Sequence, residues 1–84
     1  MRQEDLIALV EWTMPFGKYQ GRRLCDLPEE YLLWMSNREF PEGYLGHLLA
    51  VMLELRIHGL EDLLTPLKAS RPAKLRQPPP ENLQ

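Results

Sequence analysis

The amino-acid sequence predicts a mostly α-helical single domain with a small N-terminal β-hairpin, an α+β fold, and a disordered C-terminal tail. In residues 3–12, 26–37 and 43–58, apolar side chains recur every three or four positions, as they do on the buried side of a helix. Between the first two segments, residues 14–25 carry a proline and two glycines, which is typical of a tight turn between strands. The last residues are rich in proline and polar side chains and bury too little apolar surface to fold.

The chain of 84 residues is short enough to form one domain. We assign residues 1–68 to a helical domain with the hairpin at 14–25, and residues 69–84 to a flexible, Pro-rich, basic tail. The folded part then has roughly 65 residues, near the size at which a lone hydrophobic core is marginally stable. Burial against a second copy would enlarge that core, so a homodimer is one expectation for this chain.

The first predicted helix covers residues 3–12. Leu6, Leu9 and Val10 are spaced at three and four residues, so they share one side of the helix. Glu4 and Asp5 lie in the first turn, where negative charge is favourable because the helix N-terminus carries partial positive charge.

The predicted hairpin follows at residues 14–25, with the sequence MPFGKYQGRRLC. Gly17 and Gly21 permit backbone angles that other residues avoid, and Phe16 and Leu24 lie outside them as strand residues. A hairpin of this length is unstable alone, so we expect it to lie on the helices. Turn geometry is the first explanation of the two glycines.

The second predicted helix begins near Asp26, which can cap its N-terminus, with Glu29 three residues later as in a capping box. It runs to about residue 37. Tyr31 and Trp34 lie one turn apart, and their spacing predicts that both aromatic rings belong to the core.

The third predicted helix, residues 43–58, is apolar on almost every side. A helix of this kind is buried on most sides, so we expect it at the centre of the fold, covered by the other helices or by a second copy. A last helical turn at residues 60–64 is expected to end at Thr65 and Pro66. The apolar positions of the third helix are Leu45, Leu48, Leu49, Val51, Met52, Leu53, Leu55 and Ile57.

Charge is distributed unevenly along the chain. The net charge is −2, which argues against a protein that coats nucleic acid without selectivity. Acidic and basic residues balance over residues 1–26, acids predominate over 27–63, and bases predominate over 64–84. An acidic helical body is therefore expected between a locally basic turn and a basic tail.

The turn supplies the candidate ligand-binding residues, which are Lys18, Tyr19, Arg22 and Arg23. Cations beside an exposed aromatic ring suit a nucleic-acid backbone and an unstacked base, because the cations attract phosphates and the ring offers a face for stacking. Backbone N–H groups near the two glycines are also suited to a phosphate.

The same four residues also fit a turn with no ligand. In that interpretation Tyr19 packs on a helix, and Arg22 or Arg23 forms an ion pair with Glu29 or Glu30. The Gly-x-x-x-Gly spacing is common and lacks the Lys-Ser or Lys-Thr ending of a phosphate-binding loop. Both interpretations remain open from the sequence.

Metal binding and catalysis have weaker signals. Glu54 and His58 share a helix face at a spacing of four, whereas His47 lies about 10 Å further along the axis at ~1.5 Å per residue. A polar stripe with a Glu–His ion pair accounts for them without a metal. Cys25 has no recognisable base or oxyanion hole beside it, and its position suits a small core residue. We therefore expect no catalytic residues, no metal and no cofactor.

Cellular location is inferred from absences. Cys25 is the single cysteine, so no internal disulfide requires an oxidising compartment. No secretory signal is recognisable, and no run is long and apolar enough to span a bilayer. We expect a cytoplasmic protein that does not bind membranes.

Several motifs together resemble a known family. The stretch MPFGKYQGRRLCDLPEEYLLWM is similar to that of the short bacterial family of putative quorum-sensing-regulated virulence factors, a domain of unknown function. Residues 40–46, FPEGYLG, and residues 58–61, HGLE, occupy the places of two further family motifs. The resemblance covers about residues 6–67. The first half also resembles a module appended to exonuclease-like proteins of the proofreading class, which implies a nucleic-acid setting.

This resemblance implies no activity and no catalytic residues, because the family has none established and the exonuclease carboxylates are not recognisable here. We therefore expect a non-enzymatic accessory module that contacts nucleic acid or another polyanion through Lys18, Tyr19, Arg22 and Arg23, helped by Arg38 and the basic tail. The alternative is a protein-interaction or homodimerisation module built on the apolar third helix.

Overall fold

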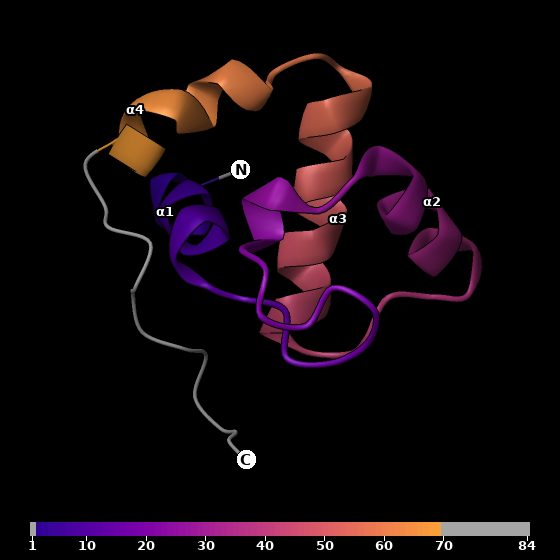
Figure 1. Ribbon diagram of the computed structural model, residues 1–84. Coiled ribbons are helices and arrows are strands. Elements are labelled where there is room, and N and C mark those ends of the chain that lie inside the picture. The colour runs from indigo at the N-terminus through magenta and orange to yellow at the C-terminus, as the bar shows by residue number, and fades with distance from the viewer. Residues whose placement is uncertain (1, 70–84) are drawn as a thin grey trace.

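The computed structural model describes residues 2–69, and residues 70–84 of the predicted tail lie outside the described part. Helix α3 runs through the middle of the described part, with α1, the 3₁₀ turn η1 and α2 packed around it (Figure 1). The 3₁₀ turn η2 and the short α4 return to contact α1. In chain order the elements are α1 (Gln3–Glu11), η1 (Leu24–Asp26), α2 (Glu29–Asn37), α3 (Tyr44–Ile57), η2 (Glu61–Leu64) and α4 (Thr65–Ala69).

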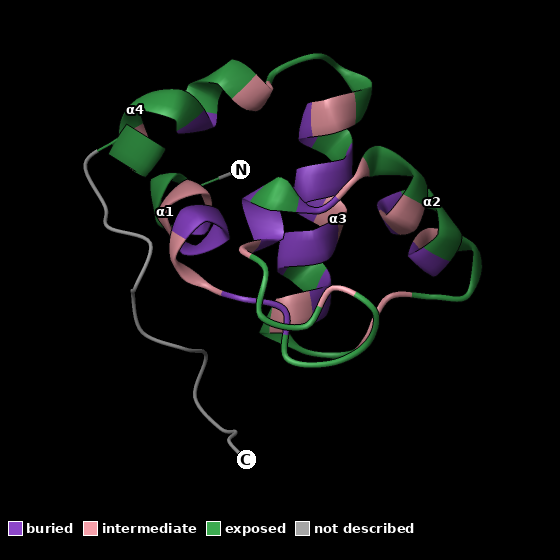
Figure 2. Cartoon of the chain, in the orientation of Figure 1, coloured by how far each residue is buried: buried purple, intermediate pink, exposed green. Residues whose placement is uncertain are grey.

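The central position predicted for the third helix is confirmed. Buried residues follow α3 along most of its length, while α1 and α2 each turn a narrower buried side toward it (Figure 2). Leu48, Met52 and Leu55 have no solvent exposure. A single subunit therefore covers most of the apolar surface of α3 without a second copy, whereas Ile57 at its C-terminal end is 52% exposed. The other buried apolar residues of α3 are Leu49, Val51 and Leu53.

The predicted β-hairpin at residues 14–25 is wrong, because residues 2–69 contain no strand. One antiparallel bridge joins Thr13 to Arg23. Around it, the N–H of Met14 donates to the carbonyl of Arg22 at 2.7 Å, and the N–H of Leu24 donates to the carbonyl of Trp12 at 3.0 Å. Beyond the bridge, the N–H of Gly21 also donates to the carbonyl of Met14 at 2.9 Å, and the residues between them form turns, so the segment is a loop closed at its base.

Backbone chemistry explains why no ladder extends beyond the bridge. Pro15 has no N–H to donate, and the next residues curl into turns in which the N–H of Gln20 donates to the carbonyl of Gly17 at 3.1 Å. Gly17 and Gly21 have φ angles of +82° and +91°, far from those of a strand. On the other side, the chain enters η1 directly after the bridge.

The boundaries of two helices also differ from the sequence prediction. The residue preceding α2 is Pro28, and no side chain caps this end of the helix, so the predicted capping box at Asp26 is wrong. The carboxylate of Asp26 instead accepts a hydrogen bond from Nζ of Lys68 at 3.1 Å. Pro66 does not end the C-terminal helical segment but lies in the first turn of α4, where its missing N–H has no intrahelical partner to lose.

A close backbone approach sets the position of the start of α3. Gly46 is buried in its first turn, and a Cβ atom added there would lie 1.7 Å from the carbonyl oxygen of Pro41. The segment between α2 and α3 therefore crosses the helix at a distance that only glycine allows. This contact places Tyr44 and His47 opposite α1.

Arg56 connects the far end of α3 to the two 3₁₀ turns. One of its terminal nitrogens donates to the carbonyl of Cys25 in η1 at 3.1 Å, and the other lies 3.5 Å from the carboxylate of Glu61 in η2.

Among the described helices, none combines the length and the apolar character needed to cross a membrane.

Candidate functional site

A cleft of about 470 Å³ opens between the closed loop and α2. The loop contributes one wall and the exposed side of α2 contributes the other. Each wall carries two aromatic rings beside other residues, and apolar and aromatic side chains are the usual lining of a ligand pocket. The lining residues are Phe16, Gly17, Lys18, Tyr19, Glu30, Tyr31, Trp34 and Met35.

Two rings in the cleft, those of Tyr19 and Trp34, each contact the ring of Tyr31. The edge of one of the two tyrosine rings meets the face of the other, with the centroids of Tyr19 and Tyr31 4.7 Å apart and their planes at 69°. Tyr31 and Trp34 are stacked at 5.9 Å with planes 17° apart. Both are favourable arrangements for aromatic pairs, so the loop is fixed to α2 by ring contacts. Tyr19 packs on α2, as the interpretation of the turn without a ligand expected.

Trp34 is exposed, and its predicted place in the core is wrong. The exposed fraction of Trp34 is 52%, and that of Phe16 is 44%. Tyr31 is only half-buried. The reason is that α2 buries Leu32 and Met35 against α3, so the neighbouring stripe with Tyr31 and Trp34 faces outward.

Positive charge surrounds this aromatic group. Nζ of Lys18 lies 5.5 Å from the centre of the Tyr19 ring, and Cζ of Arg22 lies 5.4 Å from the same centre. The guanidinium carbon of Arg38 lies 4.8 Å from the Trp34 ring. At these distances the cations interact with the π-electrons of the rings, and their charged ends remain near solvent.

The structure therefore brings together three of the four candidate residues. Lys18 and Tyr19 line the cleft, whereas Arg22 and Arg38 lie outside its lining, against the rings of Tyr19 and Trp34. Arg23 belongs instead to the bridge with Thr13 at the base of the loop and is absent from the cleft lining.

Gly17 allows the loop to approach α2 closely. Its φ of +82° is unfavourable for any residue with a Cβ, and such an atom would lie 3.1 Å from the hydroxyl oxygen of Tyr31. Turn geometry explains this glycine, as predicted, but the close approach to Tyr31 makes it part of the cleft as well.

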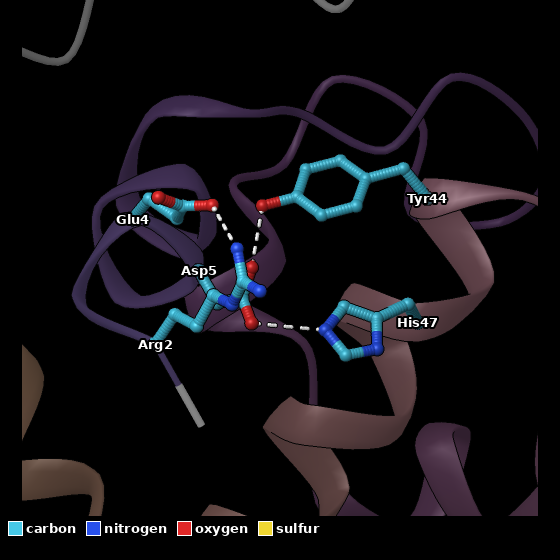
Figure 3. A network of polar contacts seen from close by, with 5 residues as sticks. All are labelled: Arg2, Glu4, Asp5, Tyr44 and His47. Carbon is cyan, nitrogen blue, oxygen red and sulfur yellow. Dashed lines mark hydrogen bonds and ion pairs between the residues drawn. The ribbon is translucent and has the colours of Figure 1, made fainter.

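A polar group formed by Asp5, Tyr44 and His47 lies away from the cleft, between α1 and α3 (Figure 3). The buried carboxylate of Asp5 accepts a hydrogen bond from the hydroxyl of Tyr44 at 2.6 Å. Its other oxygen lies 2.9 Å from Nε2 of His47, which donates in the tautomer that suits a carboxylate. The Tyr44 ring meets Trp12 edge to face at 5.5 Å. This group holds the start of α3 against α1.

These hydrogen bonds shift two pKa values in opposite directions. The Tyr44 hydroxyl, and next the His47 ring, lower the pKa of Asp5 below its ordinary value of 3.8, because both stabilise the carboxylate. Burial, and then the bond to Asp5, raise the pKa of Tyr44 to about 12. The hydrogen bond between Tyr44 and the Asp5 carboxylate therefore persists over a wide range of pH.

The remaining candidates have structural partners. His58 lies 3.3 Å from Glu54, which confirms the Glu–His ion pair expected from their spacing. Within residues 2–69, no three side chains of the metal-binding types are placed to hold one ion. Cys25 is buried, and burial followed by the charge of Asp26 raises the pKa of its thiol, which disfavours the nucleophilic thiolate.

Sequence reasoning missed the aromatic wall on α2. The signal was present in Tyr31, Trp34 and Arg38, whose spacings of three and four place them on one side of a helix. In the structure this side carries stacked rings and a cation, and Phe16 adds a further ring from the loop. Such a surface can stack a flat group and bind a neighbouring anion.

Comparison with known proteins assigns the chain to a family. The family described as "Putative quorum-sensing-regulated virulence factor" matches residues 2–67, so the chain belongs to it. Two relatives named "Uncharacterized protein YpeB", from Escherichia coli strain K12 and from Escherichia coli O157:H7, are each 54% identical over 69 residues. The match covers 81% of this chain and 96% of each relative. No solved structure matches the chain.

Proposed function

We propose that this protein is a non-enzymatic, cytoplasmic accessory module that binds nucleic acid through the cationic rim of the aromatic cleft. The observation that carries the proposal is that two cations lie close to the ring of Tyr19. Nζ of Lys18 is 5.5 Å and Cζ of Arg22 is 5.4 Å from the centre of that ring. Phosphates would contact the two cations, while the cleft beside them accepts the rest of a nucleotide.

The charges of the cleft support a polyanion as the ligand. Lys18, Arg22 and Arg38 lie around the rings, and Glu30 is the carboxylate among the lining residues. The whole chain has a net charge of −2, so a polyanion would be attracted to this local cationic surface and not to the protein as a whole. Binding through such a rim should be modest in affinity and sensitive to salt.

The experiment measures binding of the full chain to a fluorescently labelled oligonucleotide by anisotropy, over a series of salt concentrations. The variant Lys18→Ala/Arg22→Ala removes both cations from the rim. The control, Arg2→Ala/Lys68→Ala, removes the same charge from exposed residues that pair with Glu4 and Asp26 and do not line the cleft.

We expect the rim variant to bind more weakly, with a slope of log affinity against log salt reduced by about 1.4 for a single strand, since each phosphate contact contributes about 0.7. The control should retain the wild-type slope. Absence of binding by the wild type at low salt, or an equal loss in both double variants, would refute the proposal.

Homodimerisation through α3 was the alternative prediction. The structure gives it less support, because Leu48, Leu49, Leu53 and Leu55 of α3 are buried within one chain. Sedimentation equilibrium at increasing concentration tests it directly, and a monomer throughout would remove this alternative.

A further inference from the structure

We infer that the cleft selects single-stranded nucleic acid by stacking an unpaired base against its aromatic walls. This inference rests on the proposed function and adds a substrate class to it. Its basis is the group of rings and cations on the loop and α2, in which Tyr19, Tyr31 and Trp34 are in contact and Lys18, Arg22 and Arg38 lie within 5.5 Å of a ring.

The shape and composition of the cleft suit a base. Its volume of about 470 Å³ lies in the range of small-molecule sites, which is about 300–1,000 Å³. The walls carry Phe16 and Trp34, which are both large and exposed. Trp34 already stacks on Tyr31, so an inserted base would contact Phe16 and the part of the Trp34 ring that remains open. Stacking is tolerant of sequence because every base has a π-face, so the cleft can bind a base without base-specific hydrogen bonds.

The arrangement of charge sets the orientation of the nucleotide. Glu30 and Lys18 both line the cleft and both are exposed, so we expect phosphate on the side of Lys18 and away from Glu30. The cations lie at the rim over Tyr19 and Trp34, where phosphates on either side of an inserted base would reach them. A nucleotide with its neutral base inside the cleft and its charged phosphates outside would therefore complement this surface.

This orientation is available to a single strand and not to a duplex. In a duplex the faces of the bases are stacked on their neighbours, and exposing one requires unpairing and unstacking at a cost of a few kcal/mol. A base in a single strand turns outward at much lower cost. The cationic rim alone would bind both forms, so the aromatic walls provide the discrimination.

A proline-rich peptide is the main rival ligand, because aromatic grooves also bind such segments. The cations favour nucleic acid: three of them lie at the rings, whereas a groove for neutral prolines has no need of them. The peptide therefore enters as an outcome of the test.

The experiment compares the full chain and its variants for binding to a 12-nucleotide oligothymidine, to a 12-base-pair duplex and to a labelled proline-rich peptide, by anisotropy at low salt. Trp34→Ala removes one wall. Leu33→Ala is the matched control, because Leu33 is equally on the exposed part of α2 but does not line the cleft. Trp34→Phe keeps a ring and should restore part of the affinity.

We expect the wild type to bind the single strand at least tenfold more tightly than the duplex. Trp34→Ala should lower single-strand affinity by about fivefold to a hundredfold, the range of base–aromatic stacking, and should leave duplex affinity unchanged. Leu33→Ala should bind as the wild type does. The single strand should also quench tryptophan emission of the wild type and not of Trp34→Phe.

The outcomes separate this inference from the proposed function. Equal binding of both nucleic acids, lowered in Lys18→Ala/Arg22→Ala but unaffected by Trp34→Ala, would overturn base stacking and keep the cationic rim. Failure to bind either nucleic acid would overturn both. Binding of the peptide alone, lost in Trp34→Ala, would assign the cleft to protein recognition and also overturn both.

Discussion

Replacement of Gly46 by alanine tests the close approach that positions α3. On helix propensity alone the change should stabilise the protein by up to about 1 kcal/mol, because glycine is the poorer helix former. The structure predicts the opposite sign. The added Cβ would lie 1.7 Å from the carbonyl oxygen of Pro41 and 2.8 Å from the carbonyl carbon, and both of these are backbone atoms.

The magnitude follows from the displacement that the clash requires. An ordinary carbon–oxygen contact is about 3.3 Å, so the two segments must separate by about 1.5 Å. Overpacking of this kind costs typically 1–3 kcal/mol. We expect Gly46→Ala to lose about 1–3 kcal/mol of folding free energy and its melting temperature to fall by about 4–8 °C for each kcal/mol.

The assay is thermal and urea unfolding followed by circular dichroism. Ala50→Gly in the middle of α3 is the control, because it measures the propensity difference in the same helix with the opposite sign and should cost about 1 kcal/mol. If Gly46→Ala melts at or above the wild-type temperature while Ala50→Gly is destabilised, the close approach of Pro41 to α3 is not as described.

Three further predictions concern the polar group and the loop. Because the pKa of Asp5 is below 3.8 in the folded protein, its carboxylate stabilises the fold above that pH, and the stability is lost as pH falls through the folded value. Urea midpoints should therefore drop below about pH 4, and less so in Asp5→Asn; identical pH profiles would contradict this. Tyr44, with a pKa raised from 10 to about 12, stabilises the fold below pH 10 and loses that contribution as pH rises toward 12. Tyr44→Phe should flatten the alkaline limb of the same profile. Gly17→Ala should cost about 1–2 kcal/mol from its positive φ and move the Tyr31 ring, visible as changed aromatic NMR shifts; unchanged shifts and stability would refute the close contact.

The helices were predictable because each follows a local pattern. Apolar spacing located α1, α2 and α3 to within a few residues, and the apolar surface all round α3 correctly placed it at the centre. The hairpin was not predictable from composition alone. Two glycines and a proline are typical of a turn, but only the fold determines that pairing ends at Thr13 and Arg23 and that η1 follows at once.

The site was predictable in part for a similar reason. The loop sequence pointed to Lys18, Tyr19 and Arg22. It did not reveal the partner wall, because a helix of nine residues with two adjacent apolar stripes does not say which stripe faces inward. Once Leu32 and Met35 take the core, Tyr31 and Trp34 must face the loop. The contact of Asp5 with Tyr44 had no local signal, since 39 positions separate the two residues.

That separation has a consequence for folding kinetics. The hydrogen bond between Asp5 and Tyr44 closes a segment that contains the loop and α2, and the entropic cost of closing it precedes any gain from the contact. Local helices and the neighbouring pair α2 and α3 can form earlier, at lower cost. We therefore expect the bond to be absent from the folding transition state, so that Tyr44→Phe accelerates unfolding and leaves the refolding rate almost unchanged.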